Sequence, residues 1–132
     1  MMAPRMLLCC VAVLALAGCG AEQQGSGSGG PVTELTVRVD PDGKGPDAAR
    51  QASVRCGDAP EGRACAAAAD LRPRDLAPVR GDVACAELFG GPQTATVSGT
   101  LNRRAVDARF SRTNACEIAR WKKVAPLLEA AG

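Results

Sequence analysis

The chain of 132 residues contains no histidine and no tyrosine, and its only aromatic residues are Phe89, Phe110 and Trp121. Without histidine, Ser-His-Asp and Cys-His hydrolysis are excluded, and so is any metal site that needs imidazole. The scarcity of aromatic rings disfavours nucleic-acid binding by base stacking. The formal charge of +2 is close to neutral and implies no polyanionic partner. We therefore expect no nucleic-acid partner and no cofactor.

Carboxylates at a spacing suited to acid–base chemistry are also scarce. Asp70 and Asp75 form such a pair, but arginines surround them in the sequence, which is typical of surface charge rather than of a catalytic couple. We therefore expect that the protein is not an enzyme.

The first residues have the pattern of an export signal. Arg5 precedes an apolar run over residues 6–17, and small residues follow, which is the order of a secretory signal peptide. The run is too short to span about 30 Å of hydrocarbon as a stable helix.

The end of this run resembles the lipobox of bacterial lipoproteins, in which a cysteine is acylated and the chain is cut before it. The residues that match are Leu16-Ala17-Gly18-Cys19. The resemblance implies removal of residues 1–18, lipidation of Cys19, and a place on the extracellular face of the cell membrane with attachment through lipid alone. The alternative is an ordinary signal peptide that is cut elsewhere, which would leave a secreted protein.

A Gly/Ser-rich stretch follows the cysteine. Residues 20–31 contain no large apolar side chain, and such a composition behaves as a flexible tether. We expect residues 19–31 to link the lipid to one folded domain over residues 32–132.

Four of the seven cysteines lie in this domain, namely Cys56, Cys65, Cys85 and Cys116. An even number in an exported domain indicates two disulfides, and three pairings are open at this point. Pairing in chain order would close one short and one long loop, and the long one would contribute roughly 3–4 kcal/mol on the chain-entropy account. A zinc site is disfavoured because the spacings are not Cys-x-x-Cys, and we expect no metal.

Hydrophobic periodicity in the domain is mostly that of strands. Residues 65–79 can instead be helical, with Pro73 at a helix start or at a break. Asn102-Arg103-Arg104 is typical of a hairpin turn. Residues 121–130 fit a strand or a helix equally well. The alternating segments are residues 35–39, 52–56, 95–101 and 106–110.

Arginines recur around the predicted hairpin, at positions 103, 104, 109 and 112. We interpret them as a solvated strand face rather than a ligand site. The pattern as a whole predicts an antiparallel sheet with short helices between strands.

Several short motifs in the domain resemble the subtilisin inhibitor-like family of small secreted serine protease inhibitors. The most specific is the cysteine order together with Asn114-Ala115-Cys116-Glu117. The resemblance covers nearly the whole domain. Its other motifs are Leu35-Thr36-Val37, Ser53-Val54-Arg55-Cys56, Ala64-Cys65, Val83-Ala84-Cys85, Pro92 and Thr96-Val97-Ser98-Gly99.

The resemblance implies an α+β fold in which two short helices pack on one side of a five-stranded antiparallel sheet. It also implies the disulfides Cys56–Cys65 and Cys85–Cys116, and a homodimer formed through the sheet. The partner it implies is a serine protease, which would bind an inhibitory loop that follows Cys85.

The loop implied by the resemblance contains Cys85, Ala86, Glu87, Leu88, Phe89, Gly90, Gly91 and Pro92. In the family pattern, the residue two positions after this cysteine fills the protease's main specificity pocket. The resemblance therefore places the reactive bond between Glu87 and Leu88. The loop is one residue longer than is usual in the family, at Gly90-Gly91.

Glu87 stands where relatives usually carry Met or Lys, and a carboxylate buried in an apolar pocket costs several kcal/mol. Three interpretations follow. The target protease accepts acidic residues, or it binds a neighbouring side chain such as Leu88. In the third, the domain is a non-inhibitory binding module or a protease chaperone.

Overall fold

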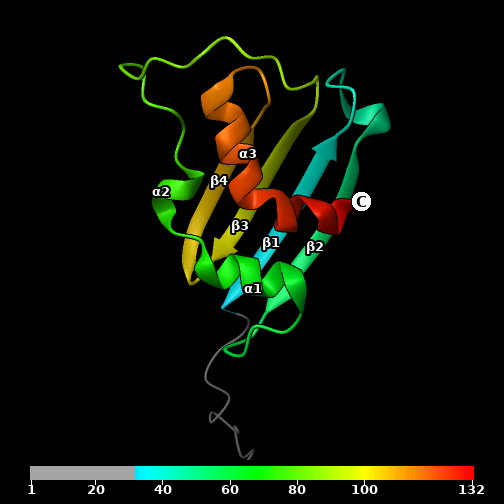
Figure 1. Cartoon of the computed structure of the whole chain (residues 1–132). Helices are drawn as coiled ribbons and strands as arrows, with labels where there is room; N and C mark the ends of the chain where they lie inside the picture. The colour runs from blue at the N-terminus through cyan, green and yellow to red at the C-terminus, as the bar shows by residue number, and fades with distance from the viewer. Residues whose placement is uncertain (1–31) are drawn as a thin grey trace, which may run out of the picture.

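The computed structural model of the chain describes residues 32–132, which form an α+β fold. A four-stranded antiparallel sheet in the order β2-β1-β3-β4 carries the helices on one face (Figure 1). The strands are β1 (Thr33–Asp40), β2 (Arg50–Cys56), β3 (Thr94–Leu101) and β4 (Arg104–Phe110). The helices are α1 (Gly62–Asp70), α2 (Pro73–Leu76) and α3 (Ala115–Leu128), with short 3-10 turns η1 (Pro46–Ala48) and η2 (Glu129–Ala131).

The predicted alternation of side chains is confirmed in the two central strands. Val37 of β1 lies opposite Ala52 on one side and Val97 on the other. Val37 and Val97 are completely buried, whereas their chain neighbours Thr36 and Thr96 lie on the face that carries no helix. The buried face meets α3 and α1, and the core of the protein lies between these layers.

The predicted hairpin turn between β3 and β4 is also confirmed. Asn102 and Arg103 have φ angles of 47° and 64°, the left-handed pair that a two-residue type I′ turn requires. Asparagine accepts this conformation more readily than most residues. Arg104 already belongs to β4.

The expectation of a fifth strand is wrong for the part of the chain that the structure describes. The tail whose sequence fits a strand or a helix continues α3 and ends in η2. Val124, Leu127 and Leu128 follow the i, i+3, i+4 spacing of one helix face, and all three are buried. Because that spacing buries three large side chains at once, the tail packs as a helix instead of adding to the sheet.

The predicted helical region over residues 65–79 is divided at Pro73. Leu71 and Arg72 are extended, and Pro73 opens the single turn α2 at the first helical position, where its missing N–H is not needed. Helices α1 and α2 both contact α3.

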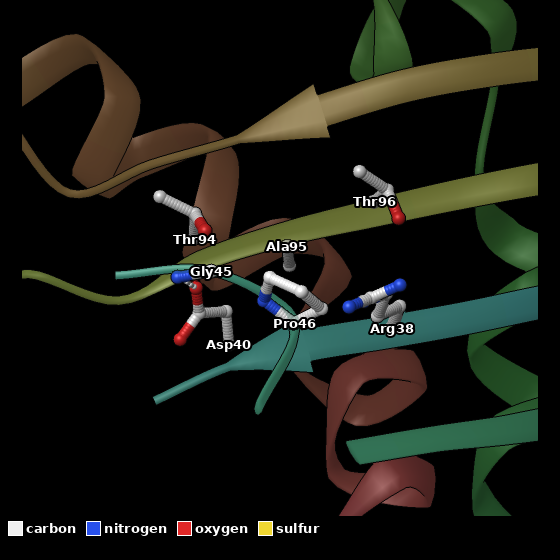
Figure 2. Close-up of a pocket in the computed structure, with 7 residues that line it drawn as sticks. All are labelled: Arg38, Asp40, Gly45, Pro46, Thr94, Ala95 and Thr96. Atoms are coloured by element: carbon white, nitrogen blue, oxygen red, sulfur yellow. Dashed lines mark hydrogen bonds between the residues drawn. The ribbon is translucent and has the colours of Figure 1, made fainter. Parts of the chain in front are cut away.

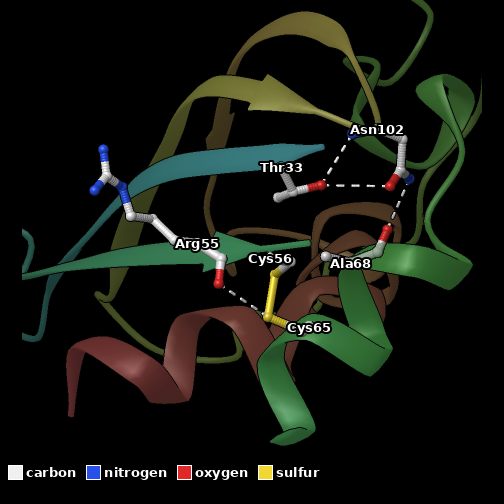
Figure 3. Close-up of a disulfide and its surroundings, with 6 residues drawn as sticks. All are labelled: Thr33, Arg55, Cys56, Cys65, Ala68 and Asn102. Atoms are coloured by element: carbon white, nitrogen blue, oxygen red, sulfur yellow. Dashed lines mark hydrogen bonds between the residues drawn. A yellow bond between two sulfur atoms is a disulfide. The ribbon is translucent and has the colours of Figure 1, made fainter. Parts of the chain in front are cut away.

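Both disulfides join the cysteines in chain order, as the family resemblance implies. Cys56–Cys65 ties the end of β2 to α1, and Cys85–Cys116 ties the segment before β3 to the first turn of α3. Figure 3 shows the first bridge beside a polar cluster in which the amide of Asn102 donates to the carbonyl of Ala68 at 2.9 Å.

The predicted signal peptide, the lipidated Cys19 and the tether over residues 19–31 lie outside the described residues. Within residues 32–132, none of the helices has the length and apolar character needed to cross a membrane.

Candidate functional site

A long segment without helix or strand connects α2 to β3. It runs from Ala77 to Gln93 and crosses the end of the sheet beside the first turn of α3 (Figure 1). Val83, Leu88 and Phe89 in this segment are 49%, 56% and 72% exposed, and they are the only exposed large hydrophobic residues among the described ones. Because these exposed apolar side chains all lie on one loop, this segment is the candidate functional site of the described domain.

The N-terminal side of this segment is fixed to the start of α3. Cys85 is bonded to Cys116, and the N–H of Ala115 donates to the carbonyl of Ala86 at 3.0 Å. The start of α3 is itself capped, because the Asn114 side chain accepts from the N–H of Glu117 at 3.0 Å. Ala86 is therefore held by a covalent bridge and a backbone hydrogen bond on a rigid helix end.

The C-terminal side is fixed at Gly90. Its N–H donates to the carbonyl of Arg112 at 2.7 Å. A Cβ atom added to Gly90 would lie 2.9 Å from two side-chain atoms of Ile118, which is closer than real contacts of this kind. The backbone can approach α3 this closely only because residue 90 is glycine.

Arg112 adds a side-chain contact on the same side. Its Nη1 donates to the Oε1 of Gln93 at 3.2 Å, and its guanidinium lies 5.9 Å from the centroid of the Trp121 ring. Trp121 is half-buried against the core. Arg112 therefore links the end of the loop to α3.

The predicted solvated face holds for three of the four arginines that sequence analysis grouped. Arg104 and Arg109 are exposed, and Arg103 forms an exposed ion pair with Asp58 at 3.0 Å. Arg112 departs from that prediction, because it is half-buried and lies beyond the end of β4.

The turn after β1 supports the last part of the loop. Gly43, with φ 68°, lies so close to the carbonyl of Pro92 that a side chain would not fit. The turn is organised by the Asp40 carboxylate, which accepts from the N–H groups of Asp42, Gly43 and Gly45 at 3.2, 2.9 and 2.8 Å. These bonds, that from Gly45 above all, hold the pKa of Asp40 below its usual value.

A shallow hollow lies beside this turn. Figure 2 shows Asp40 and Pro46 on one side of it and Thr94 and Thr96 of β3 on the other. The hollow lies between the turn after β1 and the start of β3, and β3 begins directly after the loop.

Glu87, Leu88 and Phe89 lie between the two held residues, Ala86 and Gly90, and all three are exposed. The N–H of Leu88 donates to the carbonyl of Ala86 at 2.9 Å and closes a three-residue turn centred on Glu87. Within residues 32–132 the Glu87 carboxylate has no ion-pair partner. The loop therefore offers its central backbone to solvent while both of its ends are held.

The loop residues that sequence analysis singled out, 85–92, all lie in this segment. Sequence analysis missed the residues that hold the loop from outside it, namely Gly43, Gln93, Arg112 and Ile118. None of them belongs to a recognisable motif, because their role depends on contacts between segments that are distant in the chain.

Comparisons with protein-family models, with curated proteins and with solved structures found no match to this chain.

Proposed function

We propose that the domain over residues 32–132 is a serine protease inhibitor that presents residues 85–92 to the protease as a substrate would. One observation carries the proposal: Glu87, Leu88 and Phe89 are exposed between Ala86 and Gly90, which are both hydrogen-bonded to the segment at the start of α3. The motifs shared with the subtilisin inhibitor-like family add support.

This geometry suits inhibition because a protease binds its substrate through backbone hydrogen bonds, and the backbone of residues 87–89 is exposed between two held ends. A flexible peptide loses conformational freedom when it binds, whereas a loop that is already ordered loses little and binds more tightly. The reactive bond under this proposal is Glu87–Leu88, with Leu88 and Phe89 on the leaving-group side.

The negative charge of Glu87 limits the proteases that the loop can inhibit to those whose main specificity pocket accepts an acidic side chain. Its carboxylate is exposed and lacks an ion-pair partner in the described domain, so a cation in the protease's main pocket could pair with it. We propose an exported serine protease that accepts acidic residues, in place of one with a purely apolar pocket.

The second candidate is a non-inhibitory binding module or protease chaperone on the same fold. The exposure of Leu88 and Phe89 at 56% and 72% favours it as well, because an apolar pair on a held loop can bind a protein without entering an active site. Under either function, the lipid on Cys19 would hold the domain at the extracellular face, and the helix-free face of the sheet would form the homodimer.

The deciding experiment titrates the full chain, purified in mild detergent, against subtilisin, trypsin and a glutamate-specific serine protease. We expect stoichiometric inhibition of the glutamate-specific enzyme, with slow cleavage at Glu87–Leu88 located by mass spectrometry. Rapid digestion of the loop, or no effect on any of the three enzymes, would contradict inhibition and favour the binding module.

Two variants separate the side chain from the loop. Glu87→Lys should transfer inhibition to trypsin, and Glu87→Met should transfer it to subtilisin, because the backbone anchors do not involve this side chain. The matched control is Glu61→Met, which changes an exposed glutamate that precedes α1, far from the loop. It should leave the specificity unchanged.

A further inference from the structure

We propose that Arg112 is the positioning residue that keeps the leaving-group side of the loop in place once the Glu87–Leu88 bond is cleaved, and this inference rests on the proposed function. Cleavage at that bond would divide the loop into a part that ends at Glu87 and a part that begins at Leu88. Whether the two new ends separate depends on what holds each part.

Both parts are held by one short segment that runs from the end of β4 into the first turn of α3. The part that ends at Glu87 is held by Cys116, which is bonded to Cys85, and by Ala115, whose N–H reaches Ala86. The part that begins at Leu88 is held by Arg112, whose carbonyl accepts from Gly90 at 2.7 Å. The anchors of the two parts thus lie within residues 112–116, and neither depends on the bond that is cut.

Arg112 holds its part at two points. Besides the backbone contact with Gly90, its guanidinium donates to Gln93 at 3.2 Å, just before β3 begins. The intervening Gly91 has a φ of 135°, a conformation open mainly to glycine, so this stretch needs support from outside. A single residue therefore fixes both ends of the stretch from Gly90 to Gln93.

The guanidinium is itself held in place. It lies 5.9 Å from the centre of the Trp121 ring, and Trp121 packs against the core. A planar guanidinium can stack on a ring and donate to an amide oxygen at the same time, which an ammonium group does less well.

The chemistry shows what this support would do. The protease serine gives its proton to the protease's general base as its Oγ attacks the carbonyl carbon of Glu87. The bond to the Leu88 nitrogen then breaks, and that nitrogen receives the proton from the same group. Water can then attack the ester, which leaves a Glu87 carboxylate and the free serine. Alternatively, the Leu88 amine attacks the same ester and gives a proton to the base; the peptide bond re-forms, and the released serine oxygen takes that proton.

Arg112 favours the second outcome because it keeps the amine beside the ester at a high effective concentration. It does not touch the reacting atoms, so it acts through the loop. Arg109 offers a matched comparison, because it is an exposed arginine on β4 whose side chain forms no hydrogen bond or ion pair with residues 85–93 in the described domain.

The test compares the full chain with Arg112→Ala, Arg112→Lys and Arg109→Ala, using the glutamate-specific serine protease as the probe. Mass spectrometry measures the rate of net cleavage at Glu87–Leu88. It also measures the final ratio of cleaved to intact chain, starting once from intact chain and once from cleaved chain. Arg112→Ala loses one charge-assisted hydrogen bond and the ring contact. This loss should raise the cleavage rate and the ratio of cleaved to intact chain by about tenfold each. Arg112→Lys should be intermediate, and Arg109→Ala should match the wild type.

Amide hydrogen exchange of residues 89–93 without protease supplies a readout that does not depend on inhibition. Arg112→Ala should accelerate this exchange, whereas Gln93→Glu, which offers the guanidinium a charged acceptor, should slow it. Gln93→Ala removes the acceptor alone and serves if Arg112→Ala does not fold.

The possible outcomes separate the two proposals. If the wild type inhibits but Arg112→Ala and Arg109→Ala agree within about twofold in cleavage, the role of Arg112 is overturned while the proposed function stands. If the wild type inhibits none of the proteases, the proposed function fails. Exchange that is equal in Arg112→Ala and Arg109→Ala would then also overturn the positioning of the loop by Arg112.

Discussion

The backbone N–H of Gly90 lies 2.7 Å from the carbonyl oxygen of Arg112, and this bond closes the exposed loop that Cys85–Cys116 opens. The three residues between Ala86 and Gly90 are exposed in the described domain, although hydrogen bonds hold the residues on both sides of them. This relationship between a glycine and an arginine distinguishes the loop from an ordinary surface connection and leads to the first prediction.

Gly90→Ala should displace the loop from α3. The added methyl would meet Ile118 at 2.9 Å and the Cβ of Arg112 at 3.3 Å, so the backbone must move. We expect a loss of about 1–3 kcal/mol in the free energy of unfolding, as for overpacked sites, together with faster proteolysis of the loop. Urea denaturation and limited digestion measure the two effects.

Gly81→Ala is the matched control, because the same connecting segment carries Gly81 with open space around it. It should change neither measurement. Equal behaviour of the two alanine variants would show that Gly90 does not require the close approach to Ile118.

The two disulfides should contribute differently to the free energy of unfolding and to the resistance of the loop to cleavage. Cys85 and Cys116 are 31 residues apart, while Cys56 and Cys65 are 9 apart. The entropy of loop closure then favours the longer bridge by about 1 kcal/mol. Replacing both cysteines of the longer bridge by serine should also speed cleavage of the loop, whereas the same change in the shorter bridge should not.

Thermal denaturation and timed digestion of the two double variants test this difference. A loop that resists digestion equally in both would contradict the anchoring role of Cys85–Cys116.

Asp40 should make stability depend on acid pH. Its folded-state pKa is lowered from 3.8, mainly by the hydrogen bond from Gly45. The carboxylate therefore contributes stability in full above that pH, and the contribution is lost as pH falls through the lower folded-state value. Asp40→Asn should lower the Tm near neutral pH, and the difference from the wild type should shrink below about pH 3.8.

Asp47→Asn, in the exposed turn η1, is the control and should show no such convergence. A difference in Tm between wild type and Asp40→Asn that stays constant down to strongly acid pH would contradict the role assigned to the carboxylate.

Thr33 and Asn102 should form a coupled pair. The N–H of Asn102 donates to the Thr33 hydroxyl at 3.0 Å, and Thr33 is only 1% exposed (Figure 3). Thr33→Val keeps the shape but removes the acceptor, so we expect a loss of about 1–3 kcal/mol in the free energy of unfolding. Thr100→Val, on the same sheet, is the control and should cost far less.

The Thr33 hydroxyl also donates to the side-chain Oδ1 of Asn102 at 3.3 Å, and a double-mutant cycle with Asn102→Gly checks this side-chain coupling. Glycine keeps the positive φ of the turn and the backbone N–H that donates to Thr33, while it removes the side-chain amide that bonds to Thr33 and Ala68. Strictly additive losses would indicate that the two residues act independently.

Cys19→Ala should release the protein from membranes if the lipobox-like residues direct lipidation. Fractionation of cells that express the full chain measures this, and metabolic labelling with a fatty acid checks for the modification itself. Cys9→Ala is the control, because Cys9 lies in the segment expected to be removed. Unchanged membrane retention of Cys19→Ala would contradict lipidation at this residue.

Local pattern determined much of the fold. Alternation over residues 35–39 and 95–101 identified strands that the structure contains, and the turn at Asn102 followed from a residue that tolerates positive φ. These features depend on neighbours in the chain, so the sequence carries them directly. The disulfide pairing came from a family resemblance, because spacing alone left three arrangements.

Tertiary structure decided the rest. The sequence of the tail after Trp121 fits a strand or a helix, and the tail is a helix because the i, i+3, i+4 spacing of Val124, Leu127 and Leu128 buries all three against the core. Gly90 and Arg112 meet for the same reason, since they lie on different segments that only the packing of α3 on the sheet brings together. The sequence by itself determined which segments alternate as strands, and a family resemblance pointed to the loop after Cys85, whereas the exposure of that loop and the contacts that hold it depend on long-range packing that only the folded chain provides.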